Sequence, residues 1–143
     1  MWSWKRTALV LGPALWLFLA VGSAAAGDRE LEQALEAVGA WLAVLDSGDY
    51  ARTWEQAAAY VKEKVSRERW VDNLNIVRRP LGRVISRRLN STQVTTVLPD
   101  APEGEYFVIH NQTSFESMKD VLETITLMKD RDGTWRVGGY YLE

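Results

Sequence analysis

Cysteine is absent from the 143-residue sequence, and histidine occurs only once, as His110. Without cysteine the chain can form no disulfide bond, so its stability has to come from a packed apolar core. One imidazole and no thiolate leave no cluster of the side chains that usually bind zinc, and we expect neither a metal ion nor another cofactor. The sequence also lacks a glycine-rich phosphate loop and a nucleophile elbow, so neither a nucleotide-dependent enzyme nor a serine hydrolase is indicated.

Charge is missing from a long apolar segment near the N-terminus, residues 7–22. Lys5 and Arg6 precede this segment, and residues 24–26 after it are all alanine. A basic start, an apolar middle and an A-x-A site are typical of a secretory signal peptide, so we expect cleavage after Ala26 and a periplasmic or secreted protein. An uncleaved membrane anchor is the alternative, because the apolar segment is nearly long enough to span a bilayer. No cysteine follows it, which excludes a lipid-anchored lipoprotein.

The remaining residues, 27–143, have the size of one domain and contain no internal repeat or low-complexity linker. Loss of residues 1–26 removes Lys5 and Arg6 and no acidic residue, so the formal net charge changes from −2 to −4. This acidic balance is typical of a soluble protein and gives no indication of nucleic-acid binding. No second segment is apolar enough to span a membrane, so no membrane span is expected after cleavage.

Apolar residues recur every three or four positions in the first half of the mature chain and predict three helices. The first helix begins near Leu31. Asp49 and Ser66 fit the N-caps of the second and third helices, because their side-chain oxygens can accept from free backbone N–H groups. The second helix is expected to run without a break to Val65. Pro80 ends the third helix, because proline disfavours the helical conformation in the residue before it.

Four strands are predicted after the helices, because β-branched and aromatic residues are frequent there. A long strand within residues 81–98 is expected to bend or bulge at residues 90–92. Three more strands follow as an antiparallel meander at residues 105–115, 120–129 and 134–142. The predicted fold is therefore α+β, with three N-terminal helices packed on a curved four-stranded antiparallel sheet.

Alternation along the last three strands indicates which face of the sheet is buried. The odd-numbered residues, among them Ile125 and Leu127, are the more apolar set and are assigned to the core. Asp132-Gly133 is interpreted as a two-residue hairpin turn. A pairing centred on that turn gives three cross-strand pairs: Leu127 with Val137, Ile125 with Gly139, and Glu123 with Tyr141.

Glu123 violates this pattern, because it places a carboxylate on the face assigned to the core. A buried carboxylate is costly unless it is paired or hydrogen-bonded, and the predicted register offers Tyr141 and Asn111 as neighbours. One hypothesis is a small-molecule pocket with acid–base chemistry, in which Glu123 is the base, Tyr141 the hydrogen-bond donor and Asn111 the orienting residue. The other hypothesis, which we favour, is a structural hydrogen-bonded cluster, since such clusters also enclose carboxylates.

Five arginines lie in a stretch without any acidic residue, residues 73–99. They are Arg78, Arg79, Arg83, Arg87 and Arg88. In an acidic protein this run predicts a local positive patch, which would fit an anionic envelope component such as a phospholipid or a polymer. The alternative, which we favour, is that these side chains are solvated or pair with Asp and Glu elsewhere in the chain.

Short runs of residues along the whole mature chain carry a resemblance to a known family. They are Trp41-Leu42, Asp46-Ser47-Gly48-Asp49-Tyr50, Trp54, Arg79-Pro80-Leu81-Gly82, Ser86-Arg87-Arg88, Leu98-Pro99, Gly104-Glu105-Tyr106, Thr113-Ser114-Phe115, Glu123-Thr124 and Trp135-Arg136-Val137-Gly138-Gly139-Tyr140. In this order they resemble the bacterial family catalogued as domain of unknown function 4019. Its members carry signal peptides and have no assigned activity, so the resemblance implies export and a single α+β domain and supplies no catalytic residues.

The order of helices before a curved antiparallel sheet also resembles the cystatin-like and nuclear-transport-factor-like cone folds. Such folds often hold a small-molecule pocket, although a fold does not establish a function. We therefore expect an exported envelope protein that binds a partner or ligand without catalysis. The alternative is a cone-fold protein with a small-molecule pocket or acid–base activity at Glu123 and Tyr141.

Overall fold

The computed structural model describes residues 20–143, so most of the predicted signal peptide lies outside the described residues. The helices are α1 (Ala20–Asp46), α2 (Tyr50–Glu55), α3 (Ala59–Lys64) and α4 (Arg67–Val77), followed by a 3₁₀ turn, η1 (Arg79–Leu81). The strands are β1 (Val84–Thr95), β2 (Tyr106–Phe115), β3 (Val121–Lys129) and β4 (Trp135–Leu142). They form one antiparallel sheet in the order β1-β2-β3-β4, which confirms the α+β class and the meander.

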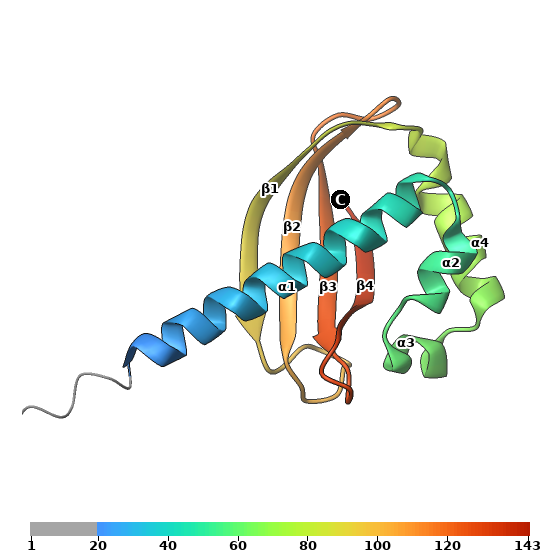
Figure 1. Ribbon diagram of the computed structural model, residues 1–143. Helices are drawn as coiled ribbons and strands as arrows, with labels where there is room; N and C mark the ends of the chain where they lie inside the picture. The colour runs from blue at the N-terminus through green and yellow to red at the C-terminus, as the bar shows by residue number, and fades with distance from the viewer. Residues whose placement is uncertain (1–19) are drawn as a thin grey trace, which may run out of the picture.

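The long helix α1 crosses one face of the sheet, and α2, α3 and α4 lie together beyond the β4 edge (Figure 1). Val38, Trp41, Leu42 and Leu45 of α1 are buried in one cluster with Phe107, Ile109, Ile125, Leu127 and Val137 of the sheet. The predicted core face is therefore confirmed, since Ile125 and Leu127 are fully buried. None of the helices within residues 20–143 combines the length and the apolar character that crossing a membrane requires.

The described residues contain four α-helices, where the sequence predicts three. Both predicted N-caps are confirmed, because the side chains of Asp49 and Ser66 accept hydrogen bonds from the first turns of α2 and α4. The second predicted helix is divided at Ala57 and Ala58. These two alanines are fully buried, and the backbone N–H of Ala58 donates to the carbonyl of Val137 at 2.9 Å. This bond to β4 replaces an intrahelical one, so the expected continuous helix becomes α2 and α3.

The hairpin between β3 and β4 differs from the predicted two-residue turn. Asp130 and Thr134 are joined by a backbone hydrogen bond around a three-residue loop, in which Gly133 has a φ of 80°. The predicted pair of Leu127 with Val137 is confirmed. This loop length suits the register, because a left-handed residue commonly closes a three-residue hairpin loop.

A bulge in β4 changes the register beyond Val137. Thr126 lies opposite Gly139 and Leu127 opposite Val137, so Gly138 is the extra residue. The predicted pairs of Ile125 with Gly139 and Glu123 with Tyr141 are therefore wrong. A shift of one residue moves each later side chain to the other face of a sheet, so Tyr140 points into the core and Tyr141 away from it. The predicted irregularity in β1 is confirmed by a register shift between Leu89 and Ser91.

Candidate functional site

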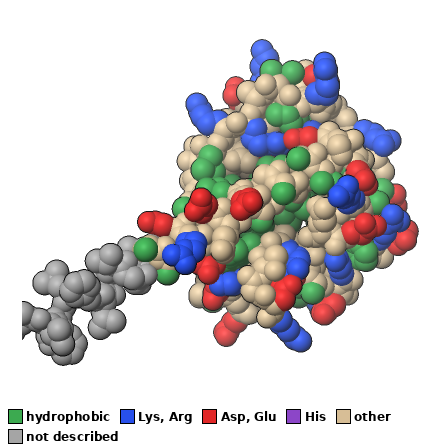
Figure 2. All heavy atoms as spheres, viewed as in Figure 1, with side chains coloured by type: hydrophobic (Ala, Val, Ile, Leu, Met, Phe, Trp, Pro, Cys, Tyr) green, Lys and Arg blue, Asp and Glu red, His purple; other side chains and the backbone are tan. Residues whose placement is uncertain are grey.

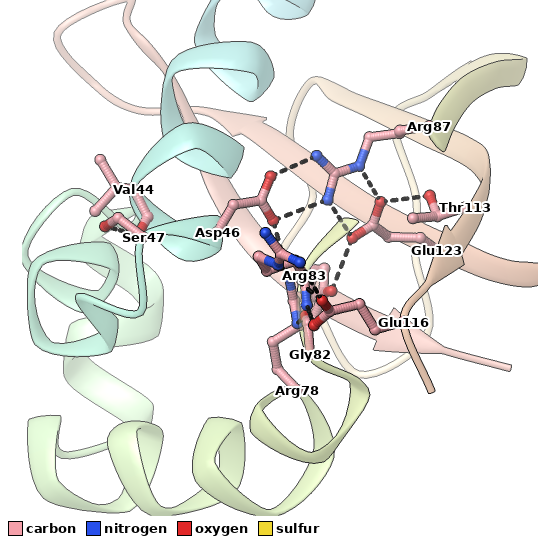
Figure 3. Close-up of polar contacts among 11 residues, drawn as sticks. Val44, Asp46, Ser47, Arg78, Gly82, Arg83, Arg87, Thr113, Glu116 and Glu123 are labelled. Carbon is pink, nitrogen blue, oxygen red and sulfur yellow. Dashed lines mark hydrogen bonds and ion pairs between the residues drawn. The ribbon is translucent and has the colours of Figure 1, made fainter. Parts of the chain in front are cut away.

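Glu123 lies at the centre of a polar cluster between the sheet and the end of α1 (Figure 3). Its side chain is 0% exposed. Arg87 donates to it from Nε at 2.6 Å and from Nη2 at 3.0 Å. Thr113 Oγ1 donates at 2.9 Å and the Tyr140 hydroxyl at 2.8 Å, so each carboxylate oxygen accepts two hydrogen bonds. The carboxylate is therefore fully satisfied by protein groups, as a buried charge requires.

Arg87 connects this carboxylate to Asp46 at the C-terminal end of α1, and Arg78 also pairs with Asp46. Arg87 Nη1 lies 2.7 Å from Asp46 Oδ2, and Arg78 Nη2 lies 3.2 Å from Asp46 Oδ1. Arg78 also donates from Nη1 to the carbonyl of Gly82 at 2.7 Å. Two guanidinium groups thus face two carboxylates. We call Asp46, Arg78, Arg87, Thr113, Glu123 and Tyr140 the Glu123 network.

The surroundings of Arg87 and Tyr140 fix the protonation states of these two side chains. Burial alone lowers the pKa of Arg87, but hydrogen bonds to Asp46 and Glu123 outweigh burial and raise the pKa well above its ordinary value. Burial, together with the negative charge of Glu123, raises the pKa of the Tyr140 hydroxyl far above its ordinary value. Tyr140 therefore stays a neutral donor and Arg87 a cation at any physiological pH.

The candidate pocket residues are arranged differently from the prediction. Glu123 is enclosed as the structural hypothesis requires, and Asn111 is buried opposite it on β2. Tyr141 is 66% exposed on the other face of the sheet, and Tyr140 takes the donor position that the sequence assigned to Tyr141. The cause is the bulge at Gly138. Two adjacent glycines in a strand are a known signal for a bulge, and that signal could have corrected the assignment.

The arginine run does not form one open positive patch. Arg78 is buried, Arg87 pairs with Asp46 and Glu123, and Arg83 pairs with Glu116 at 2.6 Å. Arg79 and Arg88 are exposed, and neither joins an ion pair within residues 20–143. Lys and Arg side chains are spread over the visible face and alternate with Asp and Glu (Figure 2). Anion binding stays a prediction for the run as a whole, which comprises Arg78, Arg79, Arg83, Arg87 and Arg88.

An apolar cleft of about 410 Å³ lies between helices α3 and α4 and the edge strand β4, and we call it the α4–β4 cleft. Trp70, Leu74 and Tyr140 line its inner part, and Ile76, Val77 and Tyr141 line its exposed rim. The other lining residues are Tyr60, Val61, Lys64, Val65, Asn73, Gly138 and Gly139. Of these lining residues only Lys64 carries a charge. Glu123 does not line the cleft; Tyr140 lies between them, with its ring in the cleft lining and its hydroxyl on the carboxylate.

The sequence gives no prediction of this cleft, because its walls come from three separate segments. The alanine break between α2 and α3 determines where α3 lies beside β4, and alanine is ordinarily a good helix former. The adjacent apolar residues Ile76 and Val77 at the end of α4 were the available signal in the sequence. No group of three or more potential metal-binding side chains occurs in the part of the chain that the structure describes.

Comparison with known proteins gives one family. The family model described as "Protein of unknown function (DUF4019)" matches residues 37–140. No curated protein and no solved structure matches the chain. The likeness to cystatin-like and nuclear-transport-factor-like folds therefore stays a prediction. The family match spans the C-terminal part of α1, helices α2 to α4 and nearly the whole sheet, and the chain belongs to the DUF4019 family.

Proposed function

We propose that this protein is an exported, non-catalytic domain that binds a small apolar ligand in the α4–β4 cleft. The observation that carries the proposal is the cleft itself. Its volume of about 410 Å³ lies within the range of small-molecule sites, and its walls are aromatic and aliphatic with few polar groups. Ile76, Val77 and Tyr141 remain exposed at its rim, where a bound apolar molecule would cover them.

The Glu123 network argues against catalysis at the carboxylate. A general base has to reach the proton that it removes, directly or through one water molecule. Glu123 is fully buried, and its oxygens already accept four hydrogen bonds from Arg87, Thr113 and Tyr140. We therefore assign the network a structural role, in which it ties the end of α1 to the sheet and holds one wall of the cleft through Tyr140.

Export is proposed from the N-terminal sequence alone, because a basic start, an apolar segment and an alanine site precede the domain. N-terminal sequencing of the protein from its native host tests it. A chain that begins at Gly27 in the periplasm or the medium supports export, and an intact Met1 in the membrane fraction contradicts cleavage.

The ligand site can be tested with 8-anilinonaphthalene-1-sulfonate, an apolar aromatic anion that fluoresces when it leaves water. We expect saturable binding of one molecule and a loss of at least tenfold in affinity for Ile76→Glu, which puts a charge at the cleft rim. Val94→Glu is the matched control, since Val94 is 69% exposed and Ile76 71% exposed, and Val94 lies on the opposite edge strand. Equal weakening by both variants, or by neither, contradicts a site in the cleft.

A further inference from the structure

A second cleft adjoins the first across the edge of the sheet. It has a volume of about 370 Å³ and is lined by the loop before β2 and by the outer face of β3 and β4. Tyr60, Gly138, Gly139 and Tyr141 line both clefts. The two clefts therefore adjoin at the β4 bulge, beside Tyr60, whose hydroxyl donates to the Asp100 carbonyl at 3.0 Å, and we call the pair of clefts the edge groove.

The glycine pair keeps this groove open. Neither Gly138 nor Gly139 has a positive φ, so the backbone does not require glycine at either position. A Cβ at Gly138 would lie 3.2 Å from Met128 Sδ, and one at Gly139 would lie 3.4 Å from Tyr141 Cε2. Met128 and Tyr141 both line the second cleft, so a larger side chain at Gly139 would occupy that cleft. Because both residues lack a side chain, the cleft beside the sheet edge stays unfilled.

The charges along the groove distinguish its two halves. Lys64 is the one charged residue of the α4–β4 cleft, and no ion pair within residues 20–143 includes it. Its ammonium group lies 5.7 Å from the centre of the Tyr60 ring, at the junction of the clefts. The second cleft contains Asp100 as its one charged residue, and its lining combines apolar side chains such as Leu98 and Pro99 with polar groups. An anionic group is therefore favoured at Lys64 and disfavoured in the second cleft.

We propose that the ligand is a single-chain anionic amphiphile. Its acidic headgroup pairs with Lys64, and its hydrocarbon chain crosses Gly138 and Gly139 into the second cleft. This inference rests on the proposed function and names the ligand class for the same site. A peptide strand is disfavoured, because the Val137 carbonyl on the free edge of β4 already accepts from Ala58, and strand addition needs a run of unpaired backbone groups.

Three probes test the proposal by displacement of the fluorescent anion: octanoate, dodecanoate and dodecan-1-ol. Each buried methylene strengthens binding by about three- to fourfold, so dodecanoate should bind about 100-fold more tightly than octanoate. In Gly139→Val this gain in affinity with chain length should largely disappear, while the affinity for octanoate should stay the same. Gly39→Val is the matched control, because an added Cβ there meets nothing within 4 Å on the exposed surface of α1. Lys64→Gln should weaken the binding of dodecanoate up to about fivefold and leave that of dodecan-1-ol unchanged, as expected for one exposed charge pair.

The outcomes separate the inference from the proposed function. If Ile76→Glu weakens binding of the fluorescent anion but octanoate and dodecanoate bind with equal affinity, the cleft is a ligand site and the proposal of a chain-like ligand is wrong. If Ile76→Glu has no effect, both proposals are wrong. Should valine at Gly139 destabilise the fold, Gly139→Ala replaces it and should reduce the chain-length gain by a smaller factor. An unchanged gain in that variant also contradicts the inference.

Discussion

Replacement of Glu123 by glutamine tests the structural role of the Glu123 network. Glutamine keeps the shape of the side chain but removes its charge and turns one acceptor oxygen into an N–H₂ donor. In either orientation of the amide, that donor would face an N–H group of Arg87 together with the hydroxyl of Thr113 or Tyr140, which donate to the carboxylate in the native protein. At least one buried donor then loses its partner.

The expected magnitude follows from burial. Removing one partner of a buried ion pair costs about 3–5 kcal/mol of unfolding free energy. The Glu123 side chain is 0% exposed and that of Arg87 18% exposed, so solvent screens the pair weakly. Asp46 lies 2.7 Å from Arg87 in the native protein and remains available to pair with it in the variant, so the expected cost is at the lower end of this range, about 3 kcal/mol. For a domain of this size that loss lowers the melting temperature by about 10 °C.

Thermal unfolding followed by circular dichroism measures the effect, with urea unfolding as a second determination of the free energy. Glu116→Gln is the matched control, because Glu116 also pairs with an arginine, Arg83, whose side chain is 84% exposed. Little change in melting temperature is expected for the control. A Glu123→Gln variant as stable as the control would refute the structural role. Loss of ligand binding at unchanged stability would instead favour a direct role of Glu123 in binding.

Three further sets of substitutions test contacts inside and outside the Glu123 network. Tyr140→Phe removes a hydrogen bond to a charged group and should cost about 2 kcal/mol, whereas Tyr141→Phe should leave the unfolding free energy unchanged in urea titrations. Ser66→Ala removes an N-cap of α4 and should cost about 1 kcal/mol by the same measurement. Asp132 accepts hydrogen bonds from the Arg136 side chain and from the backbone N–H of Thr134, and these bonds hold its pKa far below the ordinary value. The stability from that carboxylate is present at pH 7 and is lost as the pH falls below about 4, so the melting temperatures of wild type and Asp132→Asn should converge in acid.

The strands and their buried face were predictable, because alternation over three strands leaves one consistent choice of core face. Ile125 and Leu127 follow it, and Glu123 stood out as the one charge on that face. Its enclosure could be anticipated from the cost of a buried carboxylate. Its main partner, Arg87, could not be anticipated. Arg87 comes from a strand 36 residues away and belongs to a run of arginines that suggested a surface patch.

Two departures from the predicted structure come from local irregularities that periodicity alone does not encode. Alanine favours helix, yet the backbone of Ala58 bonds to β4, and this contact divides one expected helix into α2 and α3. The bulge at Gly138 exchanges the roles of Tyr140 and Tyr141, and alternation alone gives no warning of an extra residue. Both departures lie beside the α4–β4 cleft. The irregularities that the sequence pattern did not predict therefore shape the candidate site.

The most direct test of ligand binding in the α4–β4 cleft is a ¹H–¹⁵N chemical-shift titration of residues 27–143 with dodecanoate. Backbone amides of α3, α4 and the Gly138–Gly139 bulge should shift in a saturable manner, while those of Arg79, Arg88 and the exposed strand β1 should stay in place. Shifts concentrated at the arginines of β1, or none at the bulge under saturating ligand, would contradict a binding site in the cleft.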